Sequence, residues 1–350
     1  MQLSSKSTSS LPKALLLIAP FFLWGTAMVA MKGVIPHTTP FFMAGVRLVP
    51  AGILVLLVSL LLKLPQPKTW QAWLWILAFA LVDGAMFQGF LAQGIVKTGA
   101  GLGSVMIDSQ PLAVALLSSF LFAEVIGFWG WLGLGIGVLG ISLIGLPDRW
   151  IHSLFAGDLA AVDLNWWGLF DNGEWLMLLA SLSMALGTVM IPYISRHTDP
   201  VVATGWHMII GGAPLFGLSW LQESQQWQNI TIEGWLALGY ATVFGSAIAY
   251  GIFFYLASKG NLTSLSALTF LTPIFALLFG TILLSEVLSN LQSVGVFLTI
   301  ISIYLINQRD AIAAKFTVKT NELELEESSQ ANNPQPKISL KLTSSEKIAE

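Results

Sequence analysis

Ten apolar segments, each long enough to cross a membrane, take up most of this 350-residue sequence. A helix needs about 20 largely apolar residues to cross the hydrocarbon of a bilayer. The segments run over residues 14–34, 40–62, 71–95, 100–121, 127–146, 174–193, 200–221, 232–257, 262–284 and 290–307. Only 10% of the residues are charged, whereas an average soluble domain has roughly 25%. The sequence therefore predicts an all-α integral membrane protein of ten transmembrane helices, with the lipid bilayer as its main solvent.

A long internal duplication organises these segments. Residues 97–144 align without a gap on residues 259–306, with 11 identities in 48 positions. Shared hydrophobicity explains matches of Leu and Ile, but not a Lys, a Pro and a Glu that coincide at one fixed spacing of 162. The informative matches are Lys97/Lys259, Pro111/Pro273, Glu124/Glu286 and Gly133/Gly295.

The first parts of the two copies align at an offset of 160. The matched positions are Pro40/Pro200, Gly45/Gly205 and Gly52/Gly212, with Arg47 opposite His207. Each copy contains five segments, and an odd number makes the second copy enter the membrane from the opposite face. The sequence thus predicts two inverted five-helix repeats, an architecture typical of alternating access with a site between the repeats near the midplane.

The predicted domain organisation follows from these segments and from charge. It comprises a cytoplasmic N-terminal arm (1–13), a first repeat (14–146), an external linker (147–173), a second repeat (174–307) and a disordered cytoplasmic tail (308–350). Both termini are placed in the cytoplasm because Lys and Arg near the membrane are concentrated on one side. That side holds Lys6, Lys13, Lys63, Lys68, Arg196, Lys259, Arg309, Lys315 and Lys319, and the other holds Lys32, Lys97 and Arg149.

Several short motifs resemble those of a known family. The motifs are Trp24-Gly25 followed by Lys32, Pro40 with Arg47, Lys97-Thr98, and the segment from Pro111 to Glu124. In this order they resemble the EamA repeat, and two such repeats resemble a ten-helix member of the drug/metabolite transporter superfamily. The second copy departs from the pattern, since it has no evident Trp-Gly…Lys unit and carries His207 in place of the Arg. The resemblance implies a secondary transporter, often an exporter of small metabolites, amino acids or drugs, in a bacterial inner membrane.

Polar side chains within the apolar segments are the candidates for contact with a solute. An ionised group at the centre of a spanning helix costs about 2.5–3.5 kcal/mol on insertion scales, so such groups tend to face a cavity. Seven residues are predicted to bind the substrate: Lys32, Arg47, Asp83, Gln88, Asp108, His207 and Tyr250.

The two basic candidates of the first repeat lie toward the predicted external side. Arg47 lies about 10 Å into its helix, at 1.5 Å per residue, and its guanidinium can hold a carboxylate or phosphate through two hydrogen bonds. The alternatives are a contact with lipid headgroups or a structural ion pair with Asp83 or Asp108. For Lys32, at the end of the first helix, simple anchoring at the interface is favoured over lining the cavity.

The acidic candidates are confined to the first repeat. Asp83 shares one side of its helix with Gln88, which favours a cavity wall over a lipid face. Its carboxylate has three interpretations: a proton carrier, a hydrogen-bond partner of the substrate, or half of a structural ion pair. Asp108 lies just before Pro111, where a proline kink is predicted to free backbone carbonyls, and functional and structural roles are equally supported. In the second copy Asp83 corresponds to Gly245 and Asp108 to Phe270.

In the second repeat, His207 and Tyr250 are the candidates. An imidazole can take up a proton near neutral pH, so His207 is a pH-sensitive gate, a substrate contact or a structural residue. Tyr250 corresponds to Gln88 in the repeat alignment and offers a ligand a ring and a hydroxyl, or serves packing alone. Glu124 and Glu286 are interpreted as structural, because both copies retain them.

Several functional classes lack support in the sequence. It has no phosphate-binding glycine loop, no HExxH and no serine elbow, and we expect neither an enzyme, nor a cofactor, nor a metal. A net charge of −3 gives no indication of nucleic acid as a partner. The prediction is secondary active transport of a small organic solute, with export favoured, a proton as candidate coupling ion, and a monomer or homodimer. The alternatives are a membrane sensor or assembly factor, and an intramembrane hydrolase that uses Asp83 and Asp108.

Overall fold

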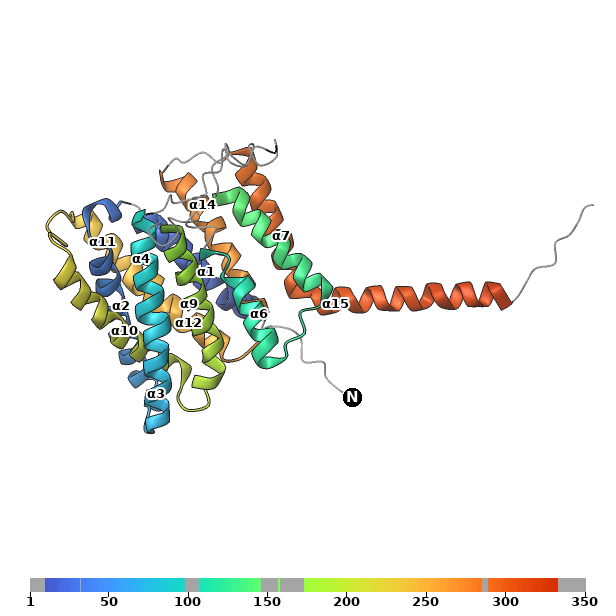
Figure 1. The fold of residues 1–350 in the computed structure, drawn as a ribbon, viewed down its shortest axis with the longest axis horizontal. Coiled ribbons are helices and arrows are strands. Elements are labelled where there is room, and N and C mark those ends of the chain that lie inside the picture. Colours follow the sequence, from blue (N-terminus) through green and yellow to red (C-terminus); the bar gives the residue numbers. More distant parts are fainter. Residues whose placement is uncertain are drawn as a thin grey trace, which may run out of the picture. The chain divides into compact units, whose positions relative to one another are not determined.

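The computed structural model describes residues 10–31, 33–97, 107–145, 157, 173–284 and 289–332, and these residues form helices and turns without a strand (Figure 1). The chain divides into two compact units, residues 1–307 and residues 308–350. The first unit contains both repeats, and every residue predicted to bind the substrate belongs to it.

Four helices of the first repeat lie within a few residues of the predicted segments, and the fourth in order, predicted from residue 100, is described from Gln110 onward. The helices of this repeat are α1 (Ser10–Met31), α2 (Pro40–Leu61), the continuous helix formed by α3 (Trp70–Phe79), η2 (Ala80–Phe87) and α4 (Gln88–Lys97), then α6 (Gln110–Phe122) and α7 (Gly127–Gly145). A short 3₁₀ turn, η1 (Ile35–His37), connects α1 to α2.

The second repeat has helices at the equivalent places. It consists of α9 (Gly173–Ile194), α10 (Pro200–Gln222), the continuous helix formed by α11 (Ile232–Tyr240), η5 (Ala241–Ile248) and α12 (Ala249–Ala257), then α13 (Leu262–Ala267), η6 (Leu268–Phe270), α14 (Leu271–Leu284) and α15 (Asn290–Asn332). In the described part of the chain, nine helices are long and apolar enough to cross a membrane, and α6 is a shorter apolar helix. The predicted set of ten helices in two repeats is confirmed.

The two repeats are related by a pseudo-two-fold axis, which the contacts of α2 with α10 reveal. A β-carbon added at Gly45 would lie 2.9 Å from the ring of Phe216, and one added at Gly205 would lie 2.7 Å from Leu56. At the offset of 160, Gly45 corresponds to Gly205 and Leu56 corresponds to Phe216, so each contact is the counterpart of the other with the two repeats exchanged. The same reciprocity holds for Gly52 with Ile209 and for Gly212 with Val49.

The order of these contacts shows that α2 and α10 are antiparallel, because the residue numbers rise along one helix as they fall along the other. A second antiparallel pair, α7 with α15, repeats the relation at the offset of 162. Gly133 packs against Ile306, and the equivalent Gly295 packs against Ile144, the equivalent of Ile306. Such reciprocal antiparallel contacts confirm that the repeats are inverted with respect to each other.

Close approach of α2 and α10 depends on glycine, and this gives a first prediction. A β-carbon at Gly52 would lie 2.6 Å from the carbonyl oxygen of Gly205, whereas one at Gly217 of α10 would meet nothing within 4 Å. We expect Gly52→Ala to destabilise the protein by about 1–3 kcal/mol through overpacking. Gly217→Ala is the matched control and should be neutral or slightly stabilising, since Ala favours helix over Gly. Thermal unfolding of the detergent-solubilised protein measures both, and equal midpoints for the two variants would contradict the prediction.

The N-terminus of α2 is held by a carboxylate from the other repeat. Thr39 precedes α2 without capping it through its side chain. Instead Glu223, just after α10, accepts hydrogen bonds from the backbone amides of Phe41 (2.8 Å) and Phe42 (3.0 Å) and from the Thr39 hydroxyl (2.7 Å). These bonds satisfy donors that a helix start leaves free. At the equivalent place in the other repeat Asp199 caps its own helix α10.

Both repeats interrupt regular α-helix at equivalent places. The π-helical stretches η2 and η5 occur in the third helix of each repeat, and such stretches are frequent at functional sites. The fourth helix of the second repeat is broken by η6 just before Pro273. In the first repeat, Pro111 lies in the first turn of α6. The turn at Asp108 and Ser109 interrupts the helix just before this proline, where the sequence predicts a kink, and a proline in the first turn of α6 costs no helical hydrogen bond.

The C-terminal tail and the linker are the predicted segments that lie outside the helical repeats. Residues 308–332, for which the sequence predicts disorder, form the last part of α15. This stretch contains many good helix formers, Ala, Lys, Leu and Glu, which explains how a polar sequence can continue a helix. The predicted linker lies outside the described residues except for Gly157 and Gly173, and so does Glu286.

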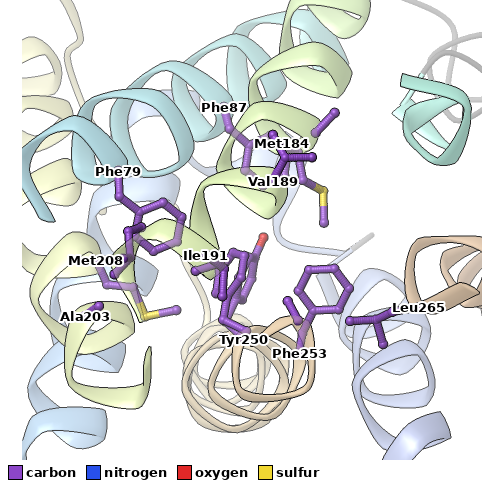
Figure 2. Close-up of a cluster of buried hydrophobic side chains, with 14 of the residues drawn as sticks. Phe79, Phe87, Met184, Val189, Ile191, Ala203, Met208, Tyr250, Phe253 and Leu265 are labelled. Carbon is purple, nitrogen blue, oxygen red and sulfur yellow. The ribbon is translucent and has the colours of Figure 1, made fainter. Parts of the chain in front are cut away.

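The centre of the first unit is a cluster of buried apolar side chains drawn from several helices. Figure 2 shows Phe79 of α3, Ile191 of α9, and Tyr250 and Phe253 of α12 lying together within this cluster. The outer surface is also apolar, with large side chains such as Phe120 exposed by 87%. An apolar surface around a packed interior fits a chain whose surroundings are lipid.

Candidate functional site

Three of the predicted residues form one chain of hydrogen bonds between the repeats. The Arg47 Nη2 group donates to Gln88 Oε1 over 3.4 Å, and Gln88 Nε2 donates to the Tyr250 hydroxyl over 2.9 Å. Gln88 and Tyr250 are both buried. They are 162 positions apart, which is the offset of the repeats, so their hydrogen bond joins equivalent positions across the pseudo-two-fold axis. The contact therefore lies where the two repeats meet.

Aromatic rings surround the Tyr250 end of this chain. The Trp24 ring meets the Tyr250 ring edge-on, with 5.1 Å between centroids, and Phe254 lies 5.8 Å from Tyr250 and 5.7 Å from the His207 ring. The indole Nε1 of Trp24 is buried and has no hydrogen-bond partner among the described residues. In the sequence Trp24 stands out only as part of a motif, and its position beside Tyr250 makes it a further candidate.

Asp83 and His207 form a second contact between the repeats. His207 Nε2 lies 3.2 Å from Asp83 Oδ2, and both side chains are about 1–2% exposed. Asp83 belongs to η2 of the first repeat and His207 to α10 of the second. Phe79 lies against the imidazole, with ring centroids 4.1 Å apart. Gly187 of α9 leaves the space for Asp83, since a β-carbon there would lie 2.5 Å from its carboxylate. A neighbouring apolar environment strengthens the attraction between the two groups.

Arg47 lacks an acidic partner in the part of the chain that the structure describes. Its Nη1 group points to the thioether sulfur of Met31 at 3.6 Å, and its Nε is buried without a hydrogen-bond partner there. Neither Asp83 nor Asp108 forms an ion pair with it among those residues, so the predicted structural pairs with these acids are not seen. Among the residues that the structure describes, the guanidinium thus meets only neutral acceptors.

Asp108 and Lys32 are the remaining candidates. Asp108 precedes α6 and forms no hydrogen bond or ion pair with any of the other described candidates, and Lys32 lies outside the described residues. Beside Asp108, polar contacts connect α6 to α9: Gln110 Nε2 donates to the Thr188 hydroxyl over 3.3 Å, and the Ser109 and Ser181 hydroxyls are 3.4 Å apart. Sequence reasoning missed the partners on α9, because hydroxyl residues are common in membrane helices and carry no distinguishing signal.

Comparison with protein families identifies the two repeats. A model described as the EamA-like transporter family matches residues 11–146 and again residues 171–308. The chain belongs to the EamA-like transporter family. An uncharacterized transporter of Synechocystis sp. is 67% identical over 314 residues, which cover 89% of this chain and 94% of that protein. A chloroplastic WAT1-related protein of Arabidopsis thaliana is 50% identical over 83% of this chain and 68% of its own length.

More distant likenesses agree with this assignment. An uncharacterized inner membrane transporter of Escherichia coli (strain K12), YedA, is 28% identical over 83% of this chain and 89% of its own length. A crystal structure of a protein with 15% identity superposes with a TM-score of 0.67, covering 85% of this chain and 98% of that one, and it shows the same fold. This EamA-like protein is a multi-pass membrane transporter, and its two inter-repeat contacts are the candidate site for a small-molecule solute.

Proposed function

We propose that the protein is a secondary active transporter that exports a small organic solute, such as an amino acid or another metabolite, by alternating access between its inverted repeats. The observation that carries this proposal is the chain Arg47–Gln88–Tyr250, which places a cationic group where the repeats meet. In transporters built from inverted repeats, the substrate lies near the midplane at this interface. We place the protein in the cell's inner or plasma membrane, with both termini in the cytoplasm.

We further propose a proton as the coupling ion, carried by Asp83 and His207. The two groups are buried together and belong to different repeats. With one proton between them the pair is neutral overall, and loss of that proton leaves an unpaired carboxylate in an apolar surrounding, which is costly. Movement of one repeat against the other separates the pair, and the carboxylate and imidazole can then exchange their proton with one side of the membrane.

Counterflow in proteoliposomes tests the proposal. Purified protein is reconstituted with a library of labelled metabolites, and exchange is measured with and without a pH gradient. We expect exchange of at least one solute without a gradient, and accumulation of the same solute when a gradient is imposed. Absence of exchange for every solute would overturn the transport proposal, whereas exchange without any effect of the gradient would overturn proton coupling alone. Removal of residues 311–350 should leave the flux intact, while a sensor would lose its output.

A further inference from the structure

The inverted repeats place charged groups at equivalent positions but with unequal partners. Arg47 of α2 is equivalent to His207 of α10, and Asp83 of η2 is equivalent to Gly245 of η5. In one half of the molecule, the basic residue and the acidic residue lie 3.2 Å apart. In the other half the basic residue is retained and the acidic side chain is missing.

The environment of Arg47 is that of a cation whose partner is absent from the described chain. Among the described residues its hydrogen-bond acceptors are the Gln88 amide oxygen at 3.4 Å and the Met31 sulfur at 3.6 Å, and both are neutral. The Nε atom is buried and has no partner there. A guanidinium removed from water is stable only when a counter-charge and hydrogen-bond acceptors replace its hydration. Its planar set of donors matches a carboxylate, which can accept two parallel hydrogen bonds.

We propose that a carboxylate of the transported solute binds Arg47 and supplies the counter-charge that Asp83 gives to His207 in the other half. This inference rests on the proposed function and adds the chemical class of the substrate, an organic acid or an amino acid bound through its carboxylate. Gly245, the counterpart of Asp83, supplies no acid of its own, so in this half the solute is the source of the carboxylate.

The packing around Gly245 determines how this can be tested. A β-carbon at Gly245 would lie 2.6 Å from the Ala27 methyl group of α1, so any larger residue there needs space. The test therefore uses Ala27→Gly as the common background and compares Gly245→Asp with Gly245→Asn. The two side chains have nearly the same size and shape, and only the first supplies a carboxylate for Arg47.

Ligand binding is measured as the increase in the thermal unfolding midpoint of the purified protein with rising ligand concentration. The probes are three carboxylates and their amides: acetate with acetamide, benzoate with benzamide, and succinate with succinamide. We expect the natural protein and the Gly245→Asn variant to be stabilised by at least one carboxylate and not by its amide. The Gly245→Asp variant should need at least about a 10-fold higher concentration of the same carboxylate for the same stabilisation, because its own carboxylate pairs with Arg47.

Two outcomes would overturn the inference. One is an equal response of the Asp and Asn variants to the carboxylate, and the other is the absence of any difference between carboxylate and amide in the natural protein. If neither double variant folds, Arg47→Gln in the natural background decides, since it must abolish the preference for the carboxylate. The natural protein can also show counterflow of a neutral solute but no difference between carboxylate and amide. That result would support the transport proposal and overturn the carboxylate site alone.

Discussion

Replacing Arg47 by Met is expected to lower counterflow of a carboxylate-bearing solute by about 10- to 100-fold. A hydrogen bond to a charged group contributes about 1.5–3 kcal/mol, and Met keeps much of the length of the side chain while removing its charge and its donors. The Michaelis constant should rise more than the maximal rate falls, because the contact with a carboxylate already exists in the bound ground state. Initial rates over a range of solute concentrations in proteoliposomes separate the two.

Two further variants make the Arg47 result specific. Arg47→Lys keeps the charge but not the planar donor set, so an intermediate loss is expected. Lys97→Met removes an exposed cation near the end of α4 and should leave transport unchanged. A solute that is transported equally well by the Arg47→Met variant and the natural protein would show that the guanidinium does not hold the substrate.

Removing one member of the Asp83–His207 pair is expected to cost about 3–5 kcal/mol of stability, because the other member is then left buried without its partner. Replacing both members by Leu should cost much less than the sum of the two single changes, since no uncompensated charge remains. The stability of Asp83→Leu, His207→Leu and the double variant is measured by denaturant or thermal unfolding in one detergent. Additive losses would show that the two residues do not act as a pair.

A second substitution at Asp83 tests whether this pair carries the coupling proton or only stabilises the fold. Asp83→Asn keeps the size of the side chain and removes its acid. We expect it to retain counterflow and to lose accumulation driven by a pH gradient. On this proposal the natural protein, which has both Asp83 and His207, shows counterflow as well as accumulation driven by a pH gradient. Loss of both activities in a folded Asp83→Asn variant would assign the residue to the substrate instead.

The helices and repeats are predictable from sequence because their causes are local and periodic. Membrane-length apolar segments and the repeated Lys, Pro and Glu positions are read directly along the chain, and the inversion follows from the odd number of helices. The partner of Asp83 is not predictable in this way. Arg47 and His207 are both plausible partners, and the choice depends on how η2 packs against α10 and on the space that Gly187 provides.

Other features depend on contacts that no local pattern encodes. The repeat alignment shows that Gln88 and Tyr250 are equivalent, but not that they meet, because only the position of the axis decides whether equivalent residues touch. Similarly, the Glu223 cap on α2 joins residues 182 positions apart and has no counterpart of the same kind in the other repeat. The exact start of α6 at Gln110, after a turn at Asp108 and Ser109, is likewise not encoded by the proline alone.

The bond between Gln88 and Tyr250 has a consequence for movement. If the inward-facing and outward-facing forms differ by an exchange of conformation between the halves, every distance between two residues becomes the distance between their counterparts. The distance between two counterparts is then mapped onto itself, so Gln88 and Tyr250 lie equally far apart in both forms. The bonds of Glu223 to α2 join residues that are not counterparts, so the same relation does not preserve them. On the proposed mechanism these bonds are free to differ between the two forms.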